Sequence, residues 1–453
     1  MSKKRCQRRI FSYAACQTKT AVLSAFFDLF LPDSLFSPIF PISFLDSCFL
    51  LYYDIFTRNN MFGVNNCMKQ HSFRRLVKTA CVLFVLCLTL SGVSRASAAE
   101  DLSHLRILIV GNSLSIDSSE YLPAVCKSCG YSNVTIGNCY IRARSLKYEW
   151  NAAEQDSPEY TYRSCKSGSS WSSLKQTTLK QVLSSQPWDI VYFQQLSWLT
   201  GDKTSYTLAD GKNVLDQLTK FTRANCPNTQ VRTGFLMTWA CKNNCQRPQY
   251  LSLYHASQSK MFSSICSVTR STISKKVSVI SYPGTAIQNA RTRYGDTLTR
   301  DDRHLSYTDG RYLAAMSVAK SSGFTLKNMK SFQGLSSSKL NALRQCVLDA
   351  AKHPYQVTKQ SWSAPSIKSL IRTNNHKLKI SWPKLNCTGY QISYSTNRQF
   401  SNAKSIWLSS KTTSVYTKRL TKNKLYYVRI RAYHKVSGVN YYSNWSGVKS
   451  RRA

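Results

Sequence analysis

The sequence predicts two folded domains of different class: an α/β domain over residues 99–352 and an all-β domain over residues 365–453. Two observations support this division. Before residue 352, apolar runs of strand length alternate with longer segments of helix length, which is typical of a parallel sheet covered on both faces. After it, short alternating runs separated by turn residues are typical of a β-sandwich.

The individual elements follow from these runs and from the residues between them. Strands of the first domain are predicted at 105–110, 134–141, 188–193, 231–237 and 277–282. Its helices are predicted at 173–185, 208–224, 249–274, 308–322 and 338–352. Prolines and serines mark residues 353–364 as a linker. Strands of the second domain are predicted at 378–382, 389–395, 404–408, 426–433 and 441–445.

Residues 68–98 have the three regions of a secretory signal peptide: basic residues, an uncharged apolar run over 79–92, and small residues at the end. A membrane anchor is the alternative, although the run is shorter than the roughly 20 residues that span a bilayer. Residues 1–67 do not fit an export signal, because aspartates and prolines interrupt their apolar stretch. We therefore expect a native start at Met68 or Met61, and a secreted protein without a membrane span after signal cleavage.

The chain is strongly basic, with 62 Lys and Arg against 21 Asp and Glu and a formal net charge of +41. Such a charge bears on partners rather than on fold. Nucleic acid, anionic lipid and an anionic cell wall are all compatible with it. The sequence holds no nucleic-acid-binding motif, and the export signal favours a cell-wall partner.

Ten of the 16 cysteines follow residue 98. An even number of cysteines in an exported chain permits disulfides, but sequence does not give their pairing. Cys126-x-x-Cys129 and Cys241-x-x-x-Cys245 could form close pairs. A zinc site is the alternative, although neither pair lies beside a histidine, and we expect no metal.

The segment ILIVGNSLS at residues 107–115 places Ser113 just past a buried strand. Ligands bind beyond the carboxyl ends of strands in open α/β sheets, and a helix N-terminus there favours an anion. These surroundings suit a nucleophilic serine and an oxyanion. The alternative is that Ser113 or Ser115 only caps the next helix.

A nucleophilic serine needs a base, and the base benefits from a carboxylate that orients it. His304 lies three residues after Asp301 in a polar segment ahead of a predicted helix. A loop aspartate at that spacing can turn back onto the imidazole. A lone histidine is more often structural, but Asp-x-x-His late in an α/β domain favours a catalytic pair.

Together these segments resemble the SGNH/GDSL hydrolase superfamily. ILIVGNSLS is similar to its first block, and RDDRHLSYTDGRYLAA is similar to its last block. YIRARSL, WDIVYFQQLS, GFLMTWA and GTAIQNARTRYGD resemble, in the same order, a bacterial branch of that superfamily of unknown function. The resemblance covers about residues 105–325 and implies a three-layer, flavodoxin-like fold.

The resemblance also implies roles for particular residues. Ser113 would be the nucleophile, Asp301 the acid that orients the base, and His304 the base. The Ser113 N–H would be one oxyanion donor. Further oxyanion or substrate-binding positions are expected at Asn112, Ala143, Gln194 and Gln195.

Two of these positions depart from the superfamily pattern. Arg142-Ala143 occupies the place where the superfamily has a glycine whose N–H is the second donor. Gln194 or Gln195 follows the third strand where an asparagine is usual, and we favour Gln194 because it comes first. A glutamine amide can donate the same bond from one methylene further out.

The second domain resembles fibronectin type III domains of exported Gram-positive proteins. Trp382 lies on an early strand, where a core tryptophan would pack. Tyr426, six residues after Leu420, resembles a tyrosine corner. The domain is either a spacer or a module that binds carbohydrate or cell wall through exposed aromatic and basic residues.

The combined prediction is a secreted serine esterase without metal or cofactor that acts on an O-acyl group of a carbohydrate or cell-wall glycan. The alternatives are an inactive SGNH domain that binds a glycan, and a structural surface protein. Arg142, Arg144 and Lys147 suggest an anionic substrate, unless they form only a solvated basic loop.

Overall fold

The computed structural model describes residues 102–453, except 244, 328, 330–333 and 437. The predicted upstream extension and signal peptide lie outside the described residues. Residues 99–453 form one compact unit of the chain. Within its described part, no helix combines the length and apolar character that crossing a membrane requires.

A seven-stranded sheet forms the centre of the first domain, in the order β4-β3-β2-β1-β5-β6-β7. Neighbouring strands among β2, β1, β5, β6 and β7 pair in parallel. At one edge, β3 pairs antiparallel with β2, and β4 pairs antiparallel with β3. The strand bounds are β1 Arg106–Gly111, β2 Thr135–Tyr140, β3 Tyr160–Lys166, β4 Lys175–Thr177, β5 Ile190–Phe193, β6 Arg232–Leu236 and β7 Val279–Ser281.

The mostly parallel sheet confirms the α/β prediction, but the antiparallel edge was not predicted. Most β3 side chains between the two ends of the strand are only half-buried, so β3 lacks the continuous apolar run by which the other strands were recognised. The helix expected at 173–185 is wrong in its first part, because β4 occupies Lys175–Thr177. Thr178 then begins a shorter helix with a capping box to Gln181.

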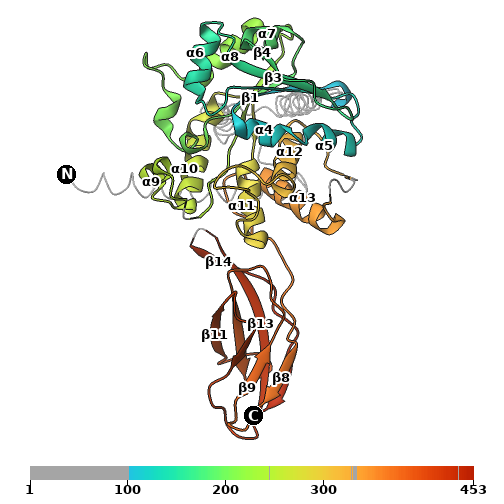
Figure 1. Ribbon diagram of the computed structural model, residues 1–453, viewed down its shortest axis with the longest axis vertical. Helices are drawn as coiled ribbons and strands as arrows, with labels where there is room; N and C mark the ends of the chain where they lie inside the picture. The colour runs from blue at the N-terminus through green and yellow to red at the C-terminus, as the bar shows by residue number, and fades with distance from the viewer. Residues whose placement is uncertain (1–101, 244, 328, 330–333, 437) are drawn as a thin grey trace, which may run out of the picture. The chain divides into compact units, whose positions relative to one another are not determined.

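Helices cover both faces of the sheet (Figure 1). Their bounds are α4 Ser113–Ser119, α5 Leu122–Ser128, α6 Leu146–Glu154, α7 Leu179–Ser184, α8 Val214–Asn225, α9 Pro248–Tyr254, α10 Gln258–Ser271, α11 Pro283–Tyr294, α12 Asp309–Ser321 and α13 Ser337–Lys352. The single helix expected at 249–274 is two helices, because His255 and Ala256 adopt left-handed φ values of 51° and 55°.

Strand β1 shows how the sheet divides two cores. Ile107 and Ile109 belong to the core shared with α4, α5, α11, α12 and α13. Leu108 and Val110 point to the opposite core, shared with α6, α7 and α8. Successive side chains of a strand alternate between faces, so an uninterrupted apolar run is what a strand buried on both faces requires. Packing on both faces holds β1 in place, and Ser113 lies two residues after its last residue.

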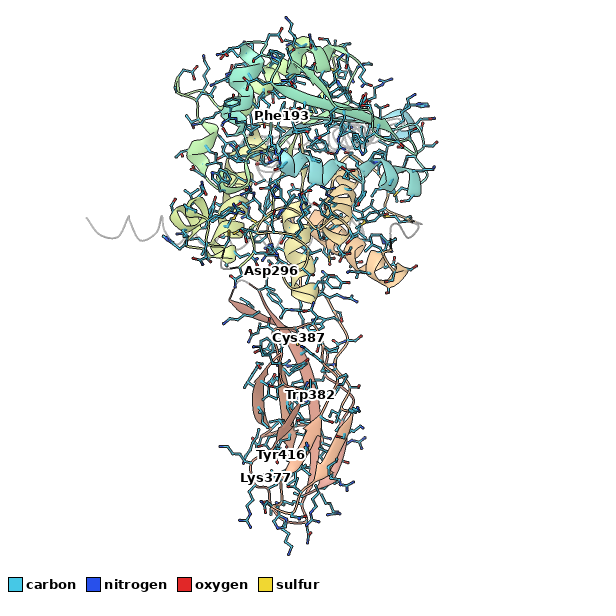
Figure 2. All side chains as sticks on the ribbon, viewed as in Figure 1. Phe193, Asp296, Lys377, Trp382, Cys387 and Tyr416 are labelled. Carbon is cyan, nitrogen blue, oxygen red and sulfur yellow. The ribbon has the colours of Figure 1, made fainter. Side chains whose placement is uncertain are left out.

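The second domain consists of two antiparallel sheets. One has the order β11-β10-β13-β14 with β15 beside β13, and the other has the order β12-β9-β8. Trp382 lies in their shared core with 2% of its surface exposed (Figure 2). Tyr426 Oη accepts a hydrogen bond from the Thr421 N–H at 3.3 Å. The bounds are β8 Ser369–Arg372, β9 Leu378–Ser381, β10 Gly389–Ser395, β11 Lys404–Ser409, β12 Ser414–Tyr416, β13 Leu425–Val436, β14 Val439–Tyr442 and β15 Lys449–Arg452.

All ten cysteines within residues 102–453 are free thiols in this structure. Burial raises the pKa of the Cys126 thiol well above its usual value, with a smaller contribution from neighbouring Cys129. Burial and neighbouring Cys245 raise the pKa of the Cys241 thiol to about 12. The two cysteine pairs suggested by spacing are therefore neighbours in space, and the raised pKa values make the Cys126 and Cys241 thiols poor nucleophiles at neutral pH.

Candidate active site

Ser113 occupies the first position of α4, directly after strand β1. Asn112 is the N-cap residue, and its Oδ1 accepts a hydrogen bond from the Leu114 N–H at 3.2 Å. Capping is thus performed by Asn112, which leaves the Ser113 hydroxyl available for another partner. The first N–H groups of a helix have no intrahelical acceptor, and the Ser113 N–H is one of them.

The structure brings Ser113, His304 and Asp301 into one hydrogen-bonded row. Ser113 Oγ lies 2.9 Å from His304 Nε2, and His304 Nδ1 lies 2.7 Å from Asp301 Oδ2. Serine and histidine are 191 positions apart in the chain, so only the folded domain joins them. With Nδ1–H donating to the carboxylate, Nε2 is the acceptor that faces the serine hydroxyl.

Asp301 is held as a carboxylate. Its Oδ1 accepts the backbone N–H groups of Arg303 at 2.9 Å and His304 at 2.7 Å. Partial burial alone would raise the pKa of this carboxyl. The two backbone hydrogen bonds and the His304 ring outweigh burial and hold the pKa well below its usual value. Asp301 is therefore negatively charged at neutral pH.

Asp301 and His304 lie in a tight turn formed by residues 298–306, which we call the catalytic loop. The Arg300 N–H donates to the His304 carbonyl at 2.9 Å, and the Ser306 N–H donates to the Leu298 carbonyl at 2.8 Å. Trp239 Nε1 also donates to the Arg303 carbonyl at 2.5 Å. No role was predicted for Trp239, although its place three residues past β6 puts it at the carboxyl ends of the parallel strands, where Ser113 also lies.

Ala143 lies in the loop after β2 and has a left-handed φ of 57°. This loop is tied to the nucleophile turn, because Asn112 Nδ2 donates to the Arg144 carbonyl at 3.0 Å. An L-residue in this conformation costs about 1–2 kcal/mol relative to right-handed backbone. A glycine at this position would pay no such penalty, so Ala143 introduces local backbone strain.

The two glutamines after β5 lie at the site but are fully buried, with 0% of their surface exposed. Gln194 Oε1 accepts the Asn112 N–H at 3.0 Å, and its Nε2 donates to the Gln195 carbonyl. Gln195 Oε1 accepts the Leu146 N–H at 3.0 Å, and its Nε2 donates to Ser205 Oγ at 3.1 Å. Both amides are thus engaged in holding β1, β5 and α6 together.

Gly111 is required by this arrangement. A Cβ at Gly111 would come within 2.5 Å of Gln194 Oε1 and 2.9 Å of Gln194 Cβ. The glycine therefore makes room for the amide that fixes the Asn112 backbone. Within the motif Gly-Asn-Ser, Gly111 leaves space for Gln194, Asn112 caps the helix, and Ser113 contacts His304.

Basic side chains surround the loop after β2. Arg142 and Arg144 are exposed, and the Arg144 guanidinium lies 4.3 Å from the centre of the Tyr148 ring. A separate cavity of about 540 Å³ lies away from the catalytic row, between α8 and the segment 275–278. Its lining includes Lys220, Arg223 and Lys275 but no member of that row.

Replacement of Ala143 by glycine should relieve strain without loss of function. If the site hydrolyses esters, as the sequence predicts, Ala143→Gly should keep kcat within about threefold. It should leave the melting temperature unchanged or higher, because relief of left-handed strain opposes the entropy cost of glycine. Ala143→Val, which adds a β-branched side chain at positive φ, should lower both. Steady-state kinetics and thermal unfolding check the pair, and a large loss of kcat in the glycine variant would contradict the assignment.

Residues 106–349 match a family model described as DUF4886, a domain of unknown function. The crystal structure of a DUF4886 family protein from Bacteroides uniformis is similar, with 28% identity and a TM-score of 0.52. The similarity covers 56% of this chain and 97% of that one. No curated protein matches the chain.

Two further solved structures share partial similarity at lower scores. The FN1–FN3 domains of chicken CNTN1 match with 20% identity and a TM-score of 0.19, over 21% of this chain and 33% of that one. A myokine structure matches with 22% identity and a TM-score of 0.17, over 20% of this chain and 97% of that one.

Proposed function

The chain belongs to the DUF4886 family, whose domain has no described function, and from its site geometry we propose that this member is a serine esterase. One observation carries the proposal: Ser113 Oγ, the His304 ring and the Asp301 carboxylate are in hydrogen-bond contact at 2.9 and 2.7 Å. A nucleophile, a base and a group that orients the base form the recurring arrangement of covalent acyl transfer.

The reaction follows from the protons that this row can move. His304 Nε2 takes the Ser113 hydroxyl proton as Oγ attacks the ester carbonyl carbon, and Asp301 stabilises the imidazolium that forms. Collapse of the tetrahedral intermediate breaks the bond to the alcohol, which leaves with the proton from Nε2. Water then gives a proton to His304 Nε2 as it attacks the acyl-serine carbonyl. Collapse of the second tetrahedral intermediate breaks the bond to Ser113 Oγ, which takes the proton back from Nε2, and the acid is released. These steps require no metal or organic cofactor.

Backbone donors stabilise the oxyanion in this proposal. The Ser113 N–H at the start of α4 is one, and the strained loop at Ala143 supplies the second. We do not assign the Gln194 amide as a third donor, because its side chain is fully buried and one of its two N–H groups donates to the Gln195 carbonyl. Loss of one oxyanion donor typically costs about 10²–10³ in rate, so we propose a slower enzyme than one with three donors.

The wider assignment rests on fold. The parallel strands follow the order β2-β1-β5-β6-β7, which supports a doubly wound, flavodoxin-like SGNH domain. The two antiparallel sheets with Trp382 between them support a fibronectin type III-like domain. We propose a secreted protein that acts on an acylated carbohydrate or cell-wall glycan.

A glycan-binding protein without turnover is the second candidate. The engaged Gln194 amide and the absence of the superfamily glycine at Ala143 favour it. It predicts binding of the glycan that Ser113→Ala leaves unchanged. The esterase predicts instead that the same substitution removes turnover and leaves the folded domain intact.

Hydrolysis of p-nitrophenyl acetate and of an acetylated oligosaccharide by residues 99–453 tests the proposal, with Ser113→Ala as the matched control. We expect the parent to release acetate from both and the variant to be slower by at least about 10²-fold. Equal rates in the two proteins would mean that cleavage is background, and the binding candidate would replace the esterase.

A further inference from the structure

Asp117 is a buried carboxylate on the same short helix as Ser113. Its side chain is 1% exposed. Arg300 Nη1 donates to Oδ1 at 3.0 Å and to Oδ2 at 3.3 Å, and Arg311 Nε donates to Oδ1 at 2.8 Å. The Leu305 N–H donates to Oδ2 at 2.8 Å. Asp117 thus accepts hydrogen bonds from three residues that lie more than 180 positions away.

Two of these donors, Arg300 and Leu305, flank Asp301 and His304 in the chain. Arg300 directly precedes Asp301, and Leu305 directly follows His304. Both ends of the segment that carries the acid and the base are therefore bonded to one carboxylate. Arg300 Nη1 also donates to the Leu305 carbonyl, which closes the two ends on each other.

The same carboxylate is fixed relative to the nucleophile. Asp117 follows Ser113 by four residues, and residues at that spacing lie on the same side of a helix. A rigid turn of α4 therefore connects the group that holds the catalytic loop to the serine that the loop must reach.

The surroundings favour a precise rather than an adaptable contact. A buried carboxylate is costly unless it is paired and fully hydrogen-bonded, and Asp117 has two guanidinium partners and a backbone N–H. The Tyr307 ring lies over both guanidinium groups, with its centre 4.6 Å from that of Arg300 and 4.8 Å from that of Arg311. Long side chains are thus held in one geometry, unlike those of an exposed ion pair.

We propose that Asp117 is a positioning residue that sets the contact between Ser113 Oγ and His304 Nε2. The proposal rests on the esterase function for its kinetic consequence, and on the contacts above for its structural one. Asp117 touches none of the reacting atoms. It acts by holding the catalytic loop to the nucleophile helix, and misplacement of a catalytic group by about 1 Å can cost 10²-fold in rate.

The first experiment compares Asp117→Asn with Asp189→Asn in the complete protein. Asp189 is a matched control, because its Oδ2 accepts the Arg106 N–H at 2.7 Å at the opposite end of β1. We expect Asp117→Asn to lower kcat by about 10²-fold with KM changed less than threefold, and Asp189→Asn to leave kcat near the parent value. Equal kcat values in the parent and a folded Asp117→Asn would overturn the proposal.

A second variant separates positioning from stability. Asp117→Leu/Arg300→Met/Arg311→Met replaces the buried charges by apolar groups, a change that is often neutral or stabilising. The proposal predicts a melting temperature near that of the parent together with the same loss of kcat of about 10²-fold. Recovery of kcat along with the melting temperature would show that Asp117 only stabilises the fold.

A readout without turnover makes the proposal independent of the esterase assignment. The Nδ1–H proton of His304, bonded to Asp301, can be followed by NMR in protein carrying ¹⁵N-labelled histidine. We expect this signal to shift or broaden in Asp117→Asn and to stay unchanged in Asp189→Asn. An unchanged signal in both would refute the coupling, whereas a shifted signal in a protein without ester turnover would refute the esterase alone.

Discussion

Replacement of His304 by alanine should lower kcat for ester hydrolysis by a factor on the order of 10⁴–10⁶. Nε2 is the atom that faces Ser113 Oγ at 2.9 Å, and without it the hydroxyl keeps its proton during attack. KM should change little, because the imidazole acts on the serine rather than on the bound ester. Steady-state kinetics on p-nitrophenyl acetate measure both constants.

The matched control for this substitution is His104→Ala. His104 is exposed at the start of the domain, before β1, and its loss should leave kcat unchanged. Residues that act as a unit give non-additive losses, so Ser113→Ala/His304→Ala should be no slower than either single variant. A double variant slower by the product of the two single losses would indicate that serine and histidine act separately.

Asp301→Asn should lower kcat by about 10⁴-fold. The carboxylate accepts the His304 Nδ1–H and two backbone N–H groups, and an amide can turn its NH₂ toward the ring and favour the wrong tautomer. The low kcat should persist at every pH of the assay, since no change of pH restores the lost acceptor. Thermal unfolding of the variant shows whether the loop itself still folds.

The pH dependence of the parent follows from the depressed pKa of Asp301. A carboxyl whose pKa is lower in the folded state stabilises the fold above its unfolded pKa of about 3.9 and loses this effect as pH falls through the folded pKa. Asp301 therefore stays ionised above that range. Mild acidification should therefore leave the Asp301 carboxylate ionised and its hydrogen bonds intact. Thermal unfolding of the parent and of Asp301→Asn between about pH 5 and pH 8 checks this, because the difference in melting temperature should stay constant.

The parallel core could be predicted because both of its faces are buried. Such strands are uniformly apolar, as in Leu108–Val110, and they stand out in a sequence without any knowledge of their partners. The edge strands β3 and β4 could not be found in this way, since half-buried and exposed residues dominate them. The division of residues 249–274 depends on two non-glycine residues at positive φ, for which the sequence has no local signal.

Ser113, Asp301 and His304 could be selected from the sequence because each is marked by its local surroundings. Ser113 follows a recognisable strand, and Asp301 and His304 are close together in the chain. The contacts of Gln194 with Asn112 and of Asp117 with Arg300 were not accessible, because these partners lie 82 or more positions away in the chain. The expectation that Gln194 donates to the oxyanion stays a prediction; the structure adds that its amide contacts the backbone of Asn112 and Gln195.

Covalent labelling tests most simply whether Ser113 is a nucleophile that His304 activates. A fluorophosphonate phosphonylates a serine whose proton is removed by a neighbouring base, with loss of fluoride. Peptide mass spectrometry then identifies the modified residue. We expect one adduct per chain, on Ser113. It should form far more slowly in His304→Ala and at the parental rate in His104→Ala. Absence of labelling in the folded parent, or labelling of another serine at the same rate, would contradict the assignment of Ser113 as an activated nucleophile.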